Sequence, residues 1–167
     1  INVSENSLME ISDLITVESV IPDLRVTSKK QTLQELSKYA SKITGQNERE
    51  VFDVLLERER LGTTGVGDGL AIPHGRLPNL KRIYGLFARL EKPVDFDSID
   101  DCPVDLVFLL LAPEGSGADH LKALATISRL LRGSSFCQKL RGANNREAIF
   151  ALLSQEPETD QALKAAS

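Results

Sequence analysis

Seven consecutive apolar residues run from Leu106 to Ala112, and Val104 extends the pattern toward the N-terminus. A strand with one solvated face alternates apolar and polar side chains, whereas this run leaves no position for a wet face. Proteins bury such a strand by covering the sheet with helices on both sides. The segment from Val104 to Ala112 is therefore predicted to be a central strand.

The rest of the chain alternates strand-like and helix-like segments. Ile83 to Leu90 is a second apolar run of strand length. Ser28 with Gln31 and Asn47 with Glu50 have the spacing of capping boxes, which start helices. The predicted helices are Ser28 to Thr44, Asn47 to a left-handed terminator at Gly62, a long helix through Leu121 and Leu131 that ends at Gly133, and two shorter helices near Ser135 to Leu140 and Asn145 to Leu153.

These elements predict an α/β fold, a three-layer α/β/α sandwich with a short mixed β-sheet. With 167 residues, of which 41% are hydrophobic, the chain is long enough for one substantial core and too short for two comfortable domains. No repeat and no long linker divides it. We expect a single domain over residues 1–167, with its core at about 13–153 and a frayed polar tail at about 156–167.

Charge and hydropathy exclude several classes of partner. The formal net charge is −4, and Lys and Arg are scattered among Asp and Glu, so no basic stripe is available for nucleic acid. The longest apolar run is far shorter than a membrane span, so no membrane insertion is expected. The first 24 residues contain no Lys or Arg, which is atypical of a secretory signal. We expect a cytosolic, that is cytoplasmic, protein.

The segment from Gly65 to Leu80 contains His74, one of only two histidines in the chain. Glycines before it leave the backbone open, so that N–H groups approach a bound anion closely. Pro73 has no N–H to donate to a neighbouring strand, and Gly75 is expected to leave the far side of His74 uncovered. A histidine presented in this way binds a metal, shuttles protons or attacks as a nucleophile.

Two of these chemistries find little support in the chain. A metal site needs three or four ligands, yet the chain offers only His120, Cys102 and Cys137 besides His74, and no HExxH spacing occurs. Both cysteines are interpreted as reduced and structural, and we expect no metal and no cofactor. A hydrolase would need a nucleophile such as that of the GxSxG elbow, which is absent from the sequence. Phosphoryl acceptance remains, because it needs only an accessible imidazole, a cation and nearby donors.

At this point the motifs carry a family resemblance. The run LGTTGVGDGLAIPHG, Leu61 to Gly75, resembles the signature of the enzyme IIA components of the fructose/mannitol class of the bacterial phosphoenolpyruvate-dependent phosphotransferase system (PTS). Within that class it is similar to the nitrogen-regulatory type. The blocks Pro93 to Asp100, Pro103 to Phe108 and Leu111 to Pro113 agree as well, as does His120 at the head of a helix.

The resemblance implies a phosphotransferase in which His74 accepts a phosphoryl group from an HPr-like phosphocarrier, NPr in the nitrogen-related system. It also implies that Arg58 and His120 flank the acceptor. The nitrogen-regulatory type implies that phosphorylation state decides which proteins are bound, and partners in that family include potassium-transport proteins and sensor kinases. The alternative is a sugar-specific enzyme IIA that passes the group to a separate IIB protein.

The residues support these roles independently, but each has an ordinary structural alternative. Arg58 lies directly before the glycine loop, where its guanidinium group reaches an anion, or it is a solvated charge in a charged run. His120 follows Ser116 and Asp119, which have capping-box spacing, so the positive helix end should favour a neutral ring. Alternatively, it is a half-buried histidine capping a loop, and His74 itself is a rigid turn histidine.

The immediate surroundings of His74 supply further candidates. Four residues are predicted to bind phosphate through hydroxyl or backbone groups, namely Thr63, Thr64, Gly65 and Gly75. An apolar rim around His74 is the predicted docking surface, because added phosphoryl charge there would oppose docking. The rim residues are Leu70, Ile72 and Leu77.

Overall fold

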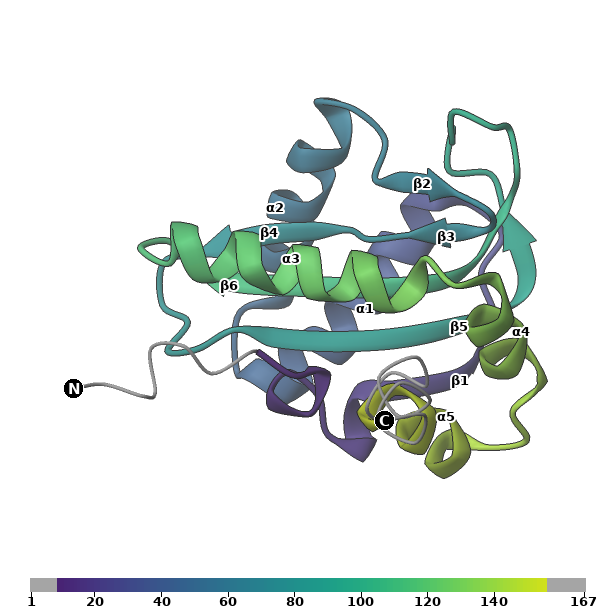
Figure 1. Ribbon diagram of the computed structural model, residues 1–167. Helices are drawn as coiled ribbons and strands as arrows, with labels where there is room; N and C mark the ends of the chain where they lie inside the picture. The colour runs from purple at the N-terminus through teal and green to yellow at the C-terminus, as the bar shows by residue number, and fades with distance from the viewer. Residues whose placement is uncertain (1–8, 156–167) are drawn as a thin grey trace.

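Strand β6 (Val104–Pro113) runs through the middle of a six-stranded sheet, which confirms the prediction from its apolar run. The computed structural model describes residues 9–155 and is shown in Figure 1. The predicted frayed tail, 156–167, lies outside the described residues. Nearly every residue of β6 is buried, as expected for a strand with helices on both sides.

The sheet is mixed, as predicted. Its order is β1-β5-β6-β3-β2, and β4 pairs with β6 beyond the end of β3. The pairs β1–β5, β3–β6 and β4–β6 are parallel, whereas β5–β6 and β2–β3 are antiparallel. The other strands are β1 (Val20–Leu24), β2 (Gly65–Gly67), β3 (Leu70–Ala71), β4 (His74–Leu77) and β5 (Tyr84–Val94).

Five helices cover the two faces of the sheet within residues 9–155. They are α1 (Lys29–Thr44), α2 (Glu48–Arg60), α3 (Gly117–Leu131), α4 (Ser134–Gly142) and α5 (Arg146–Ser154), and two 3-10 turns, η2 (Ile11–Asp13) and η3 (Val17–Ser19), precede β1. In Figure 1, α3 crosses in front of the sheet while α1 and α2 lie behind it. The three-layer α/β/α prediction is confirmed.

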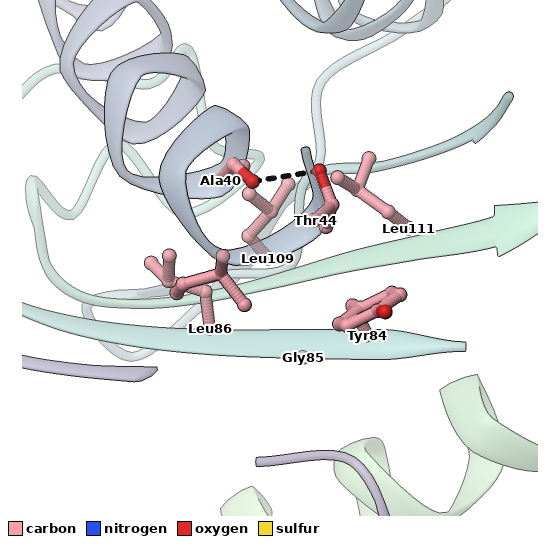
Figure 2. Close-up of a pocket in the computed structure, with 8 residues that line it drawn as sticks. Ala40, Thr44, Tyr84, Gly85, Leu86, Leu109 and Leu111 are labelled. Atoms are coloured by element: carbon pink, nitrogen blue, oxygen red, sulfur yellow. Dashed lines mark hydrogen bonds between the residues drawn. The ribbon is translucent and has the colours of Figure 1, made fainter. Parts of the chain in front are cut away.

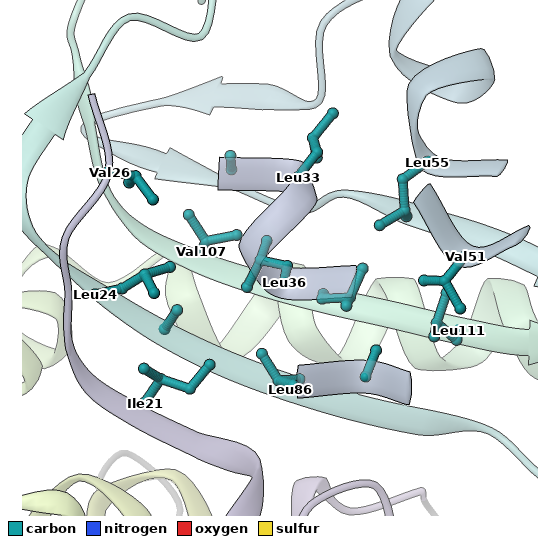
Figure 3. Packing of buried hydrophobic residues seen from close by; sticks show 14 of the residues in the cluster. Ile21, Leu24, Val26, Leu33, Leu36, Val51, Leu55, Leu86, Val107 and Leu111 are labelled. Atoms are coloured by element: carbon teal, nitrogen blue, oxygen red, sulfur yellow. The ribbon is translucent and has the colours of Figure 1, made fainter. Parts of the chain in front are cut away.

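Two apolar layers hold the sandwich together. One joins α1 and α2 to the sheet, and Figure 3 shows Leu33 and Leu36 of α1 and Val51 and Leu55 of α2 facing the strands. The other joins the opposite face to α3, α4 and α5. Residues that alternate along β6 enter opposite layers, because successive side chains of a strand point to opposite faces.

The first layer is tightly filled. A cavity of about 10 Å³ remains where the end of α1 meets β5 and β6 (Figure 2). Thr44, the last residue of α1, lines this cavity, and its hydroxyl donates to the carbonyl of Ala40 over 2.8 Å. A space of this size holds no more than one water-sized molecule, so no ligand fits into it.

The predicted helix starts are confirmed at α1 and α2, but their details differ. Ser28 accepts from the Gln31 N–H, and Asn47 accepts from the Glu50 N–H. The Gln31 side chain does not return to Ser28 and instead accepts from the N–H and hydroxyl of Thr27. The capping box is therefore one-sided at Ser28.

The helix ends predicted at Gly62 and Gly133 are confirmed in position, because α2 ends at Arg60 and α3 ends at Leu131. The left-handed conformation predicted for Gly62 is wrong. The C-cap of α2 is Leu61, whose conformation is right-handed, and Gly62 has a φ of 154°, outside the left-handed helical region. Gly133 has a φ of −74° and is the N-cap of α4. Both glycines lie in short connections, Gly62 between α2 and β2 and Gly133 between α3 and α4.

Each lateral edge of the sheet has a feature that limits pairing with a further strand. At β2, Thr63 donates to the carbonyl of Phe96, and the Asp68 N–H donates to Asp100 over 2.9 Å, so the loop before β6 lies along the strand. At β1, Pro22 has no N–H to offer. The carbonyl of Pro22 accepts from Arg89 at 2.9 Å.

Candidate functional site

His74 is the first residue of β4, directly after the short strand β3 and Pro73. Its backbone lies opposite Leu110 of β6, and the Pro73 carbonyl accepts from the Leu110 N–H over 2.9 Å. The His74 ring nitrogen Nδ1 lies 2.9 Å from the carbonyl oxygen of Ile72. Since a carbonyl only accepts, Nδ1 carries the proton and Nε2 presents a lone pair.

Arg58, in the last turn of α2, faces that lone pair. Its Nε donates to His74 Nε2 over 3.2 Å, and its Nη1 donates to the carbonyl of Gly62 over 2.8 Å. Arginine has donors only, so this contact agrees with the proton position set by Ile72. The predicted neighbourhood of Arg58 and His74 is present, and the guanidinium group is not merely solvated.

His120 completes the cluster from the first turn of α3. Its ring centroid lies 5.5 Å from that of His74, with an angle of 70° between the two planes. Its side chain is buried, with the residue only 5% exposed. The two rings meet because β6, which leads toward α3, lies beside β4.

Burial determines the charge state of both rings. Desolvation lowers the pKa of His74, the hydrogen bond to Ile72 partly opposes this effect, and the positive charge of Arg58 adds to it. Desolvation also lowers the pKa of His120, followed by the effects of His74 and Arg76. Both rings are therefore neutral near pH 7, which leaves His74 Nε2 free to react.

The capping box predicted before His120 is wrong. Ser116 does not cap the helix with its side chain, because its hydroxyl donates to the carbonyl of Pro113 over 2.7 Å. The neutral ring thus owes its state to burial first, not to a capping box at the helix end. The tautomer of His74 is set by the Ile72 carbonyl.

Arg76 is a member of the cluster that the sequence interpretation missed. Its Nε donates to His120 Nδ1 over 3.1 Å. The available signal was the strand period, because Arg76 lies two positions after His74 and so shares its face of β4. Without a strand prediction for this segment, Arg76 was one of many charged residues.

The hydroxyl groups of Thr63 and Thr64 are already engaged within the fold. Thr63 donates to Phe96, and Thr64 donates both its hydroxyl, at 2.7 Å, and its backbone N–H, at 2.8 Å, to Glu59. Glu59 is buried and also accepts from Lys29 at 3.2 Å. The loop after α2 is therefore fastened by Glu59, another residue that the sequence interpretation missed.

The two candidate glycines allow close packing instead of an open approach. A side chain at Gly65 would overlap Ser98, and one at Gly75 would overlap Val54 of α2. Helix α2 fills the space next to Gly75, and the expectation that this glycine leaves the far side of His74 uncovered stays a prediction. Phosphate binding by backbone groups of these residues stays a prediction.

Comparison with known proteins settles the family of the chain. Residues 13–156 match the family model described as "Phosphoenolpyruvate-dependent sugar phosphotransferase system, EIIA 2". The chain belongs to this EIIA family. The nitrogen regulatory protein of Bradyrhizobium diazoefficiens is 61% identical over 90% of this chain and 99% of its own length. That of Klebsiella oxytoca is 34% identical over 96% of this chain and 99% of its own.

A solved structure agrees with the sequence relatives. The nitrogen regulatory protein IIA-Ntr from Neisseria meningitidis superposes with a TM-score of 0.82 and 34% identity, covering 86% of this chain and 98% of that one. The α/β fold of this EIIA domain is therefore that of a known IIA-Ntr protein. No helix within residues 9–155 is long and apolar enough to span a membrane.

The apolar rim predicted on this EIIA domain does not exist as a surface. Leu70, Ile72 and Leu77 are 5%, 4% and 1% exposed and belong to the two core layers. Alternating strand residues that flank a site are drawn into the core when helices cover both faces. The exposed apolar side chains next to the cluster are Leu61, which follows α2, and Leu121, which follows His120.

The remaining candidate ligands of this EIIA domain lie apart from the histidines. Cys137 is buried and donates to the carbonyl of Leu131, and the half-buried Cys102 donates to that of Pro103. Within the described part of the chain, no group of three or more His, Cys, Asp or Glu side chains is arranged to hold a metal ion.

Proposed function

We propose that this EIIA protein accepts a phosphoryl group on Nε2 of His74 from an HPr-like phosphocarrier such as NPr. The observation that carries the proposal is the pair of contacts on the His74 ring, in which Nδ1 donates to Ile72 and Nε2 faces Arg58. These contacts leave Nε2 without a proton, and its lone pair accepts from Arg58, a cation suited to phosphoryl oxygens.

The transfer balances without a further reactant. The Nε2 lone pair forms the new N–P bond while the N–P bond to the donor's histidine breaks, and the donor nitrogen recovers its electron pair. His74 Nδ1 keeps its proton, and its hydrogen bond to Ile72 stabilises the positive charge that the ring gains. As the bond forms, Arg58 exchanges its contact with Nε2 for one with the phosphoryl oxygens, which releases the lone pair.

We propose a regulatory role for the phosphorylated and free forms. The support is the name of the relatives, since those at 61% and 34% identity are nitrogen regulatory proteins. A phosphoryl group on His74 adds about two negative charges to the site. Potassium-transport proteins and sensor kinases are the target classes we propose, and a cytosolic location remains a prediction.

The acceptor assignment is tested by labelling with a radioactive phosphoryl group through an enzyme I-like protein and the HPr-like carrier. The wild type should take up one group per chain on His74, in an acid-labile form, and phosphorus–nitrogen NMR should place it on Nε2. His74→Ala should take up none.

His120→Ala is the matched control, because it removes the other histidine of the cluster. It should still accept one group per chain, but more slowly. Normal labelling of His74→Ala would contradict the assignment. Efficient transfer from labelled His74 to a IIB protein, with no partner distinguishing the two forms, would favour the sugar-specific alternative.

A further inference from the structure

Arg76 connects strand β4 with helix α3. Its Nε donates to His120 Nδ1 over 3.1 Å, and its Nη2 lies 4.0 Å from the position that a Cβ atom on Gly117 would take. The guanidinium group thus lies across the first turn of α3, next to both histidine rings. Its side chain is otherwise exposed at the surface.

This contact determines which nitrogen of His120 carries the proton. An arginine side chain offers only donors, so Nδ1 of His120 must present a lone pair. In a neutral ring the proton then sits on Nε2. The opposite tautomer would place two N–H groups against each other.

The Nε2–H group of His120 is a buried donor without an acceptor. It is the only ring nitrogen of the two histidines with no hydrogen-bond partner in the described residues, 9–155. Buried polar groups in folded proteins nearly always have a partner, so an orphan of this kind calls for an explanation. The centroids of the His74 and His120 rings are 5.5 Å apart, which is close enough for a group bound to His74 to accept from this N–H.

We propose that Arg76 is a positioning residue that selects the Nε2–H tautomer of His120 and so keeps a hydrogen-bond donor ready for the phosphoryl group on His74. The inference rests on the proposed function, because it takes that phosphoryl group as the acceptor. In the other tautomer, a lone pair on Nε2 would face the phosphoryl oxygens and oppose them. Arg76 therefore acts through His120, and not by contact with the reacting atoms.

The tautomer is measured in the unphosphorylated protein, with no donor present. Nitrogen NMR of histidine-labelled wild type should show His120 protonated on Nε2. In Arg76→Glu the new carboxylate accepts from Nδ1–H, so the proton should move to Nδ1. Arg25→Glu is the matched control, since it makes the same charge change at an exposed residue paired with Glu91, and His120 should keep the wild-type tautomer there.

Transfer rates then test whether the tautomer matters. Arg76→Glu should slow phosphoryl transfer to His74 by roughly tenfold or more. The same substitution in a His120→Gln background should cost less than about threefold, because the glutamine amide supplies a donor whatever lies at position 76. An equal loss in both backgrounds would mean that Arg76 acts through its own charge, and would overturn the inference.

The remaining outcomes separate the inference from the function beneath it. An unchanged His120 tautomer in Arg76→Glu overturns the inference, even if His74 is phosphorylated normally. A wild type that shows the expected tautomer but accepts no phosphoryl group overturns the proposed function. In that case the proposed effect of Arg76 on the transfer rate is overturned as well, whereas its selection of the His120 tautomer is not.

Discussion

The guanidinium group of Arg58 is held at two of its nitrogens, one against His74 Nε2 and one against the Gly62 carbonyl. A side chain fixed in this way loses little further freedom when a phosphoryl group arrives, so more of its charge interaction is available to the transferring group. It is also half-exposed, so the fold depends on it only slightly.

Arg58→Ala should therefore slow phosphoryl transfer by at least about tenfold, or about 1.4 kcal/mol, with little change in melting temperature. Arg60→Ala is the matched control, since Arg60 lies two positions away and pairs with the exposed Glu57. Rapid-quench transfer assays and thermal melts check both variants. If Arg58→Ala and the wild type transferred at the same rate, Arg58 would return to the class of solvated surface charges.

At the scale of elements, one close contact sets the distance between α2 and β4. Val54 and Arg58 are four residues apart, so they share a face of α2. Val54 packs on the bare Cα of Gly75, and this approach brings Arg58 within 3.2 Å of His74. The glycine thus determines the geometry of the site although its backbone need not touch the phosphoryl group.

Gly75→Ala should force α2 away from β4 and lower the free energy of unfolding by about 1–3 kcal/mol. It should also slow phosphoryl transfer, because Arg58 moves with the helix. Val54→Ala removes the overlapping methyl groups, so the double variant should recover part of both losses. Urea unfolding and transfer assays on the four proteins measure the coupling, and purely additive effects would contradict this account.

Long elements were predictable from the sequence, and short ones were not. The apolar run of β6 and the spacing in α1 and α2 are local signals that tertiary contacts only reinforce. Strands β2 and β4 are three and four residues long, and they exist because β3 and β6 provide partners for them. The Ser116 hydroxyl likewise had two possible partners, the Asp119 N–H as a donor in a capping box or the Pro113 carbonyl as an acceptor, and the fold of the preceding loop decided for Pro113.

The same distinction applies to the candidate site. His74 was predictable because glycines and prolines around it are unusual in themselves, and Arg58 and His120 followed from the family resemblance. Arg76 and Glu59 were not, because their roles arise only when β4 meets α3 and when the loop after α2 folds back. The predicted apolar docking surface was wrong for the same reason, since the exposure of a strand residue depends on which helices cover the strand.

At the scale of the whole molecule, the half-buried His74 and the buried His120 make folding sensitive to acid. Burial lowers the pKa of His74 and of His120 from the ordinary value of 6.5. Between the lowered values and about pH 6.5, the unfolded chain binds more protons than the native protein, so the free energy of unfolding rises with pH. Stability is then lost as the pH falls below about 6.5.

Each histidine can contribute a slope of up to about 1.4 kcal/mol per pH unit within that window. Urea unfolding of the wild type from about pH 8 to 5 should show this loss, and the double variant His74→Gln, His120→Gln should show a shallower one. The difference between the two curves isolates the histidines from the carboxylates that titrate at lower pH. Parallel curves over the whole range would contradict the expectation.

The two edges of the sheet restrict how molecules of this protein meet. An exposed edge strand is a template on which another chain extends the sheet, and such pairing leads to polymers. Here the loop bonded to Asp68 lies along β2, and at the opposite border Pro22 of β1 has no backbone N–H to donate. A second molecule that extended the sheet would therefore have to displace the loop at β2 or pair with β1 around Pro22.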